Sequence, residues 1–141
     1  MTEAIQDNVY WVGYTDWQLR HFHGHELSLH HGTTYNAYLV RDRKTALIDL
    51  VWSPFRDDLI ENLRQVVDLE HLDYIVVNHA EPDHSGALPE LVRRAPNATI
   101  VCSERGRESI RGHYHADWDL KTVKTGERIS LGERELVFVE A

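Results

Sequence analysis

The segment "NHAEPDHSG", residues 78–86, places four potential metal ligands close together. His79, Glu81, Asp83 and His84 lie within six consecutive positions. Four donors this close cannot easily wrap one ion, but they could serve two adjacent ions, His79 with Glu81 and Asp83 with His84. Histidine mixed with carboxylate favours non-haem iron or manganese, whereas imidazole alone suits zinc equally well. Glu81 is therefore the residue that argues for iron.

Proline and glycine set the expected conformation of this segment. Pro82 removes a backbone donor and biases Glu81 toward an extended conformation, and Gly86 lets the chain turn away. We therefore predict an extended, bent loop rather than a helix. In such a loop His79, Glu81 and Asp83 share one side, and His84 needs a local bend to join them. The alternative is a solvated polar loop in which Asp and Ser cap a helix.

The elements on either side of the motif explain why it could carry chemistry. Residues 73–78 ("DYIVVN") form a nearly continuous apolar run, which predicts a strand buried on both faces. Residues 86–94 ("GALPELVRR") predict a short helix. Loops at strand ends are where α/β proteins usually place their functional residues.

Strands and helices alternate through the rest of the chain. A helix is predicted from Ser53 as N-cap, with Pro54 in its first turn, and another from Ser103 toward His113. Further strands are predicted at residues 8–14, 34–40, 45–50, 98–102, 120–123, 127–130 and 135–140. The segments 34–40 and 45–50 are expected to form a hairpin. The pattern predicts a mixed α/β (α+β) layer architecture.

Length and composition narrow the class of protein. The 141 residues suggest a single domain, and the formal charge of −8 without a basic patch argues against nucleic-acid binding. The apolar runs are far shorter than the roughly 20 residues of a membrane span. One cysteine, Cys102, and the lack of a leader-like start point to a reducing cytoplasm.

The chain carries ten histidines, which need separate accounts. The segment "HFHGHELSLHH" is either an exposed polar loop or an adventitious metal site, with His21, His23, His25, His30 and His31. The pair in "GHYHADW", His113 and His115, has ligand-like spacing, but a predicted helix end also favours an imidazolium there.

As a set, several segments resemble the flavodiiron proteins, and specifically their nitric oxide reductase (flavorubredoxin) branch. The pattern H-x-E-x-D-H, as His79, Glu81, Asp83 and His84, resembles the iron-binding motif of that family. The likeness extends over the chain in "WVGYTDWQLRHFHG", "GTTYNAYLV", "LDYIVVNHAEPDHSGAL", "GHYHADW" and "VKTGERISLG".

The resemblance implies a metallo-β-lactamase-like αββα sandwich with a diiron centre. It implies reduction of nitric oxide to nitrous oxide, or of dioxygen to water. Electrons would come from FMN in a flavodoxin-like domain and from a rubredoxin-type donor, within a head-to-tail homodimer. His23, in "FHG", would be a pocket residue that hydrogen-bonds to the gas or supplies a proton.

Two features depart from the family pattern. The family's remaining ligands lie downstream of the motif, beyond Ala141, and the flavodoxin-like domain is absent from this chain. Residues 1–141 therefore resemble the N-terminal half of the diiron domain, which is expected to bind iron weakly and to be inactive alone. Two other functions stay open: a binuclear zinc hydrolase of the same fold, and a non-catalytic interaction module that binds no metal.

Overall fold

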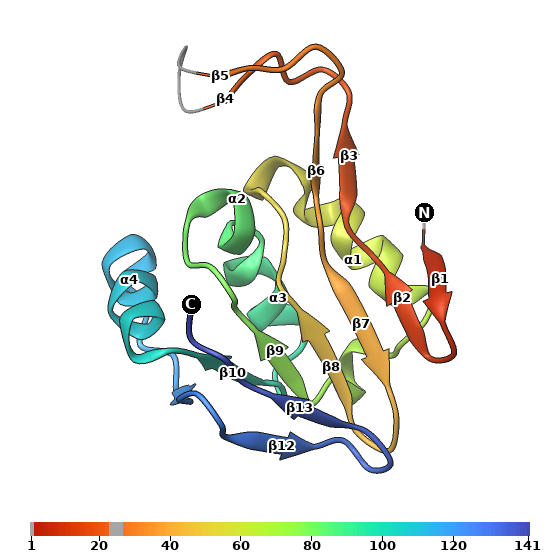
Figure 1. Ribbon diagram of the computed structural model, residues 1–141, viewed down its shortest axis with the longest axis vertical. Helices are drawn as coiled ribbons and strands as arrows, with labels where there is room; N and C mark the ends of the chain where they lie inside the picture. The colour runs from red at the N-terminus through yellow and green to blue at the C-terminus, as the bar shows by residue number, and fades with distance from the viewer. Residues whose placement is uncertain (1, 23–26) are drawn as a thin grey trace.

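The computed structural model describes residues 2–22 and 27–141. A mixed sheet of seven strands forms its centre, in the order β1-β2-β7-β8-β9-β10-β11 (Figure 1). Neighbouring strands are antiparallel from β1 to β8 and parallel from β8 to β11. The strands of this sheet are β1 (Glu3–Gln6), β2 (Val9–Trp11), β7 (Tyr38–Arg41), β8 (Thr45–Ile48), β9 (Tyr74–Val76), β10 (Thr99–Cys102) and β11 (Leu120–Thr122).

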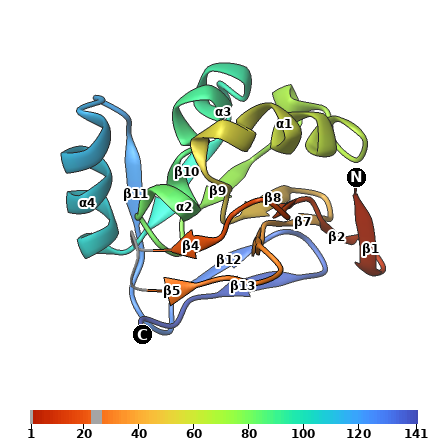
Figure 2. The same cartoon turned by 90° about the horizontal axis from the view of Figure 1, so that it is seen from above.

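Different elements cover the two faces of the sheet (Figure 2). Helices α1 (Arg56–Arg64) and α3 (Leu88–Arg94) lie on one face, and α4 (Glu104–Tyr114) lies near β10 and β11. The other face carries the hairpin of β12 (Arg128–Ser130) and β13 (Glu135–Val137). This layering confirms the mixed α/β prediction. Among the described helices, none is long and apolar enough to cross a bilayer.

Alternation along the central strands explains the two hydrophobic clusters. Successive side chains of a strand point to opposite faces, so a strand covered on both faces is apolar throughout. In β9, Ile75 enters the helix-side cluster and Val76 enters the hairpin-side cluster. In β8, Leu47 and Ala46 divide in the same way. The prediction of a strand buried on both faces is confirmed, although the strand spans Tyr74–Val76 rather than all of residues 73–78.

The predicted hairpin is present, but its first strand is interrupted. Strands β7 and β8 pair antiparallel, with Tyr38 opposite Ile48. The predicted strand at 34–40 is divided into β6 (Thr33–Tyr35) and β7, and the one at 8–14 into β2 and β3 (Tyr14–Asp16). At Gly13 the chains approach so closely that a Cβ atom would lie 2.0 Å from the carbonyl oxygen of Tyr35. Only glycine fits where the strands leave the main sheet.

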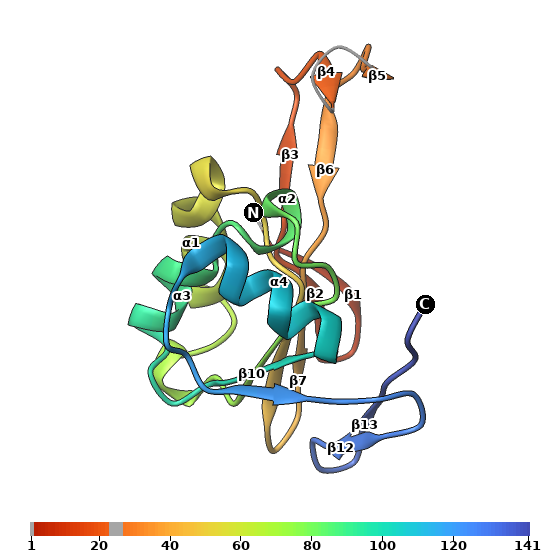
Figure 3. The same cartoon turned by 90° about the vertical axis from the view of Figure 1, so that its left-hand side faces the viewer.

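Beyond that crossing, β3 and β6 form a two-stranded ribbon that projects from the body (Figure 3). The short pair β4 (His21–Phe22) and β5 (Leu27–Ser28) lies at its far end. The described residues of the segment "HFHGHELSLHH" therefore lie at the end of a projecting ribbon rather than in a simple loop. His23 and His25 lie outside the described residues.

One of the two predicted helix caps is correct. The Ser103 Oγ atom accepts a hydrogen bond from the Gly106 amide at 3.0 Å and begins α4, as predicted. Ser53 does not cap a helix. It is the first residue of a short 3₁₀ turn, η1 (Ser53–Phe55), whose N-cap Trp52 makes no side-chain cap. Pro54 lies in the first turn as predicted, where its fixed φ is compatible with a helical start.

Candidate metal centre

The segment with the four predicted ligands leaves the end of β9 and turns into a short helix, α2 (Pro82–Ser85). The prediction of an extended loop was therefore wrong from Pro82 onward. Glu81 is extended, with φ −63° and ψ 152°, as a residue before proline should be. Pro82 then occupies a first helical position, where it needs no amide proton. The amides of His84 and Ser85 both donate to the Glu81 carbonyl at 2.9 Å and close the turn.

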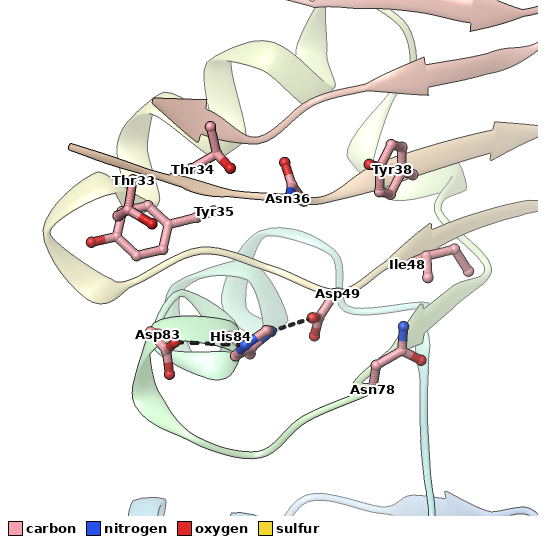
Figure 4. A pocket seen from close by; sticks show the side chains of 10 residues that line it. All are labelled: Thr33, Thr34, Tyr35, Asn36, Tyr38, Ile48, Asp49, Asn78, Asp83 and His84. Carbon is pink, nitrogen blue, oxygen red and sulfur yellow. Dashed lines mark hydrogen bonds and ion pairs between the residues drawn. The ribbon is translucent and has the colours of Figure 1, made fainter. Parts of the chain in front are cut away.

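This turn brings Asp83 and His84 next to Asp49, a residue that sequence reasoning did not single out. Asp49 directly follows β8 and adopts a left-handed conformation, with φ 61°. Its Oδ2 atom lies 2.6 Å from His84 Nδ1, and His84 Nε2 lies 3.6 Å from Asp83 Oδ2. Figure 4 shows His84 between the two carboxylates, on the wall of a cavity of about 320 Å³.

The hydrogen bonds define which nitrogen of His84 can bind a cation. Because an ionised carboxylate only accepts hydrogen bonds, Nδ1 carries a proton and donates the hydrogen bond to Asp49. In the neutral ring, Nε2 then has the lone pair and lies 3.6 Å from Asp83 Oδ2. Metal-binding histidines typically hold one ring nitrogen against a carboxylate in this way while the other binds the metal. Asp83 and His84 therefore fit a metal ion as they stand.

His79 and Glu81 do not fit a metal ion in their present arrangement. Both side chains are exposed, and neither lines the cavity. The His79 ring stacks on the His84 ring at a centroid distance of 4.9 Å. Its Nδ1 atom accepts a hydrogen bond from the Glu81 amide at 3.1 Å, so the ring proton of the neutral form is on Nε2. This bond has to break before His79 can bind a cation through Nε2 in its neutral form.

The side chains of the described residues do not by themselves complete the coordination of a metal ion. In residues 2–22 and 27–141, no group of three or more His, Cys, Asp or Glu side chains is arranged to hold an ion. The pair Asp83–His84 is supported by Asp49, and the pair His79–Glu81 needs rearrangement. A metal ion here would keep open positions that other ligands must fill.

The charge of Asp49 also suits a neighbouring cation. The residue is 7% exposed, and burial raises the pKa of its carboxyl, although the hydrogen bond with His84 opposes this. Its Oδ1 atom is buried without a hydrogen-bond partner of good geometry in the described structure. A buried carboxylate of this kind is stabilised by positive charge close by.

Tyr35 forms another part of the cavity wall, with Asp16 behind it. The Tyr35 hydroxyl lies 3.5 Å from Asp16 Oδ2, and both residues are buried. Burial, together with the negative charges of Asp16 and Asp83, raises the pKa of Tyr35 to about 12. Tyr35 therefore stays neutral at physiological pH and can donate a proton in a hydrogen bond. Sequence reasoning assigned it only to a strand.

The remaining candidates lie away from this cavity or outside the described residues. His23, predicted to contact the gas, falls in the segment 23–26 that the structure does not describe. His113 and His115 are exposed at the end of α4, and His115 is its left-handed C-cap. Cys102 is buried as predicted, and burial raises the pKa of its thiol to about 11, so it behaves as a small apolar side chain.

Comparison with known proteins identifies the family of this chain. The sequence profile of the metallo-beta-lactamase superfamily matches residues 32–139, which is most of the chain. The chain belongs to the metallo-beta-lactamase superfamily. The predicted metallo-β-lactamase-like fold is thereby confirmed.

Within this superfamily, the similar proteins include nitric oxide reductases. The nitric oxide reductase of Moorella thermoacetica is 51% identical over 139 residues, covering 98% of this chain and 35% of that protein. The anaerobic nitric oxide reductase flavorubredoxin of Vibrio vulnificus is 49% identical, covering 100% of this chain and 29% of that protein. This metallo-beta-lactamase superfamily chain thus spans about a third of the length of these relatives.

Solved structures show the same relationship. The rubredoxin oxygen:oxidoreductase of Desulfovibrio gigas superposes with a TM-score of 0.95 at 40% identity, covering 99% of this chain and 35% of that one. The flavodiiron protein of Giardia intestinalis gives a TM-score of 0.91 at 30% identity, covering 97% and 33%. The resemblance to flavodiiron proteins is therefore confirmed for a fragment of their length.

Proposed function

We propose that this chain is part of the metal domain of a flavodiiron reductase that converts nitric oxide to nitrous oxide or dioxygen to water. The observation that carries the proposal is the arrangement Asp49–His84–Asp83 beside the cavity. It occurs in a chain that is 51% identical to a nitric oxide reductase over 98% of its length.

Each predicted ligand has a part in this proposal. His79 and Glu81 would hold one iron, and Asp83 and His84 the other, with Asp49 orienting His84. When bound, the two irons would supply electrons and open coordination positions for the gas. Tyr35 would present a neutral hydroxyl to the same cavity, and His23 would provide a hydrogen bond or a proton.

The proposed metal is iron because of Glu81. A hard carboxylate in place of a third imidazole favours iron over zinc, and its charge offsets the charge of a second nearby cation. Zinc without iron in the loaded protein would instead indicate a binuclear hydrolase, in which the metals activate water.

The remaining components of the proposed reductase lie outside this chain. FMN would be held by a flavodoxin-like domain, a rubredoxin-type protein would donate electrons, and two subunits would associate head to tail. The reaction would take place in the cytoplasm. The names of the relatives, flavorubredoxin and rubredoxin oxygen:oxidoreductase, support the flavin and the rubredoxin-type donor.

A chimera tests the proposal directly. The matching third of the Moorella thermoacetica nitric oxide reductase is replaced by this chain. Metal content, anaerobic consumption of nitric oxide and consumption of dioxygen are then measured. We expect iron binding and turnover. Asp83→Asn in the grafted part should remove both, whereas Asp57→Asn, on the exposed side of α1, should change neither. A folded chimera that takes up no iron and consumes neither gas would overturn the proposal.

The isolated chain provides a second test. With at most two ligands from this chain on each ion, water must fill most of the coordination sphere, so ferrous binding should be weak and turnover absent. Anaerobic equilibrium dialysis against ferrous iron measures this. Tight binding of two irons per chain would contradict the proposed division of ligands.

A further inference from the structure

A second contact holds the ligand segment, on the side opposite Asp49. The side chain of Ser85, at the end of α2, is fully buried. Its Oγ atom lies 2.7 Å from the Ala80 carbonyl oxygen, 3.1 Å from the Glu81 carbonyl oxygen and 2.6 Å from the Tyr114 hydroxyl. Tyr114 is the last residue of α4, so this contact links α2 and α4 through two residues that are 29 positions apart in sequence.

The directions of these hydrogen bonds follow from counting protons. A carbonyl oxygen only accepts, so the single hydroxyl proton of Ser85 has to point at Ala80 or Glu81. Tyr114 must then be the donor in its contact with Ser85. The resulting series of hydrogen bonds runs from the Tyr114 hydroxyl to Ser85 Oγ and on to the backbone carbonyls of Ala80 and Glu81.

These hydrogen bonds end at the backbone of Ala80 and Glu81, in the part of the segment that carries the two exposed ligands, His79 and Glu81. Ala80 lies between His79 and Glu81, whose side chains are both exposed and lack the support that Asp49 gives His84. On the opposite side, the Leu50 amide donates to the His84 carbonyl at 3.1 Å, and the Ala87 amide donates to the Val51 carbonyl at 3.0 Å. The backbone of the segment is thus fixed on one side by the residues that follow β8 and on the other side by the end of α4.

We propose that Tyr114 and Ser85 are positioning residues for the metal site, which hold the Ala80–Glu81 backbone so that His79 and Glu81 can face the same ion. This inference rests on the proposed function for its metal, but the backbone restraint exists without metal. Neither side chain needs to touch an ion, because the effect passes through the carbonyls of Ala80 and Glu81.

The restraint is tested first without metal, by amide hydrogen exchange in the 141-residue chain. Tyr114→Phe removes only the hydroxyl donor. The amides of His84, Ser85 and Gly86, which close α2, should exchange roughly five-fold faster or more, since one hydrogen bond is lost beside them. The amides of Val77 and Thr99, which bond to the carbonyls of Val101 and Asp73 between neighbouring strands, should keep their rates. Unchanged rates in α2, or an equal increase in the sheet, would overturn the inference.

Metal binding is tested next, with cobalt(II) as a spectroscopic probe titrated to millimolar concentration. Loss of a group that orients metal ligands typically costs roughly 10–100-fold in affinity, so Tyr114→Phe and Ser85→Ala should each weaken cobalt binding by that order. The double variant should be no weaker than the worse single variant, because the two residues act as one unit. Equal affinity in all variants would overturn the inference.

Tyr74→Phe is the matched control. Tyr74 is also a partly buried tyrosine, and in the described part of the chain its hydroxyl makes no hydrogen bond. This variant should leave both α2 exchange and cobalt affinity unchanged. If the unmodified chain binds no cobalt at millimolar concentration, the role of the pair in metal binding fails, whereas the proposed function is decided separately by iron uptake and gas consumption in the chimera. If it binds cobalt and Tyr114→Phe changes nothing, only the positioning role fails.

Discussion

The Nδ1 atom of His84 lies 2.6 Å from Oδ2 of Asp49, so a partly exposed imidazole is held by a nearly buried carboxylate. The His84 side chain is 42% exposed and the Asp49 side chain 9%. The other ring nitrogen, Nε2, lies 3.6 Å from Asp83 Oδ2. Because the hydrogen bond to Asp49 already fixes the His84 ring, the ring loses little rotational freedom when it binds a cation.

Replacing the carboxylate should therefore weaken metal binding more than folding. We predict that Asp49→Asn lowers cobalt or iron affinity by roughly 10–100-fold, because the His84 ring loses a charged acceptor. Folding stability should hardly fall. Burial raises the pKa of Asp49, so its ionised form costs folding free energy above its ordinary pKa, and a neutral amide removes that cost. Asparagine also tolerates the left-handed conformation at this position.

Isothermal titration and urea unfolding at neutral pH measure the two effects. Asp57→Asn, an exposed change in α1, is the control and should alter neither quantity. If Asp49→Asn lowers the free energy of unfolding but leaves the metal affinity of the folded protein unchanged, Asp49 has a purely structural role.

Gly86 provides a test of how tightly α2 is seated. A Cβ atom there would lie 2.5 Å from both the Pro82 carbonyl oxygen and the Ser53 amide nitrogen. Backbone atoms cannot move aside cheaply, so Gly86→Ala should destabilise the fold by about 1–3 kcal/mol and displace the ligand segment. Urea unfolding measures the loss.

Gly112→Ala is the control for Gly86→Ala, and its effect on stability should have the opposite sign. A Cβ atom at Gly112 would meet nothing within 4 Å, and the residue lies inside α4. Alanine in a helix interior is favoured over glycine by about 0.5–1 kcal/mol, so this variant should be slightly more stable. Equal effects from both substitutions would show that α2 is not confined as described.

Local patterns in the sequence predicted the elements well, and their failures have physical causes. Apolar runs located β9 and β10 because both faces of these strands are covered. The segment after Pro82 was misjudged because proline disfavours helix before itself but suits a first helical turn. The division of the strands at Gly13 depends on contact with Tyr35, which is distant in sequence.

Only some residues of the candidate site could be predicted from the sequence. Clustering revealed Asp83 and His84, whereas Asp49 lies 35 residues from His84 and meets it only through the parallel pairing of β8 and β9. One signal was present: Asp49 is a lone acid at the end of the apolar run "TALIDL". The Tyr114–Ser85 contact had no local signal, because it depends on where α4 ends.

Asn62 should be important for stability through two buried carbonyls. The residue is 3% exposed, and its Nδ2 atom donates to the carbonyls of Val12 and Gly13 at 3.1 and 3.0 Å. These carbonyls lie next to the crossing at which β3 leaves the sheet. Asn62→Ala would leave them unsatisfied, at a cost of about 1–3 kcal/mol in the free energy of unfolding.

The control for this effect is Asn97→Ala. Asn97 also donates to a carbonyl, that of Glu70, at 3.0 Å, but the contact is exposed and water can replace it. Its free energy of unfolding should change by less than about 0.5 kcal/mol. Chemical denaturation of the two variants compares a buried with an exposed bond of the same kind, and equal losses would contradict the assigned role of burial.

Tyr35 should make the fold sensitive to alkaline pH. Burial, Asp16 and Asp83 raise the pKa of Tyr35 from its ordinary 10.0 to about 12, so the folded state holds the phenol proton more tightly than the unfolded state does. The stability that depends on this proton is complete below pH 10 and is lost as the pH rises toward 12. Phenylalanine cannot ionise, so the stability of Tyr35→Phe relative to the unmodified chain should increase across that range.

Urea midpoints at pH 8, 10 and 11 measure this change in relative stability. Because the buried Cys102 thiol is common to both proteins, its ionisation cancels in the comparison. Parallel pH profiles for the two proteins would show that the Tyr35 hydroxyl is free to ionise in the fold.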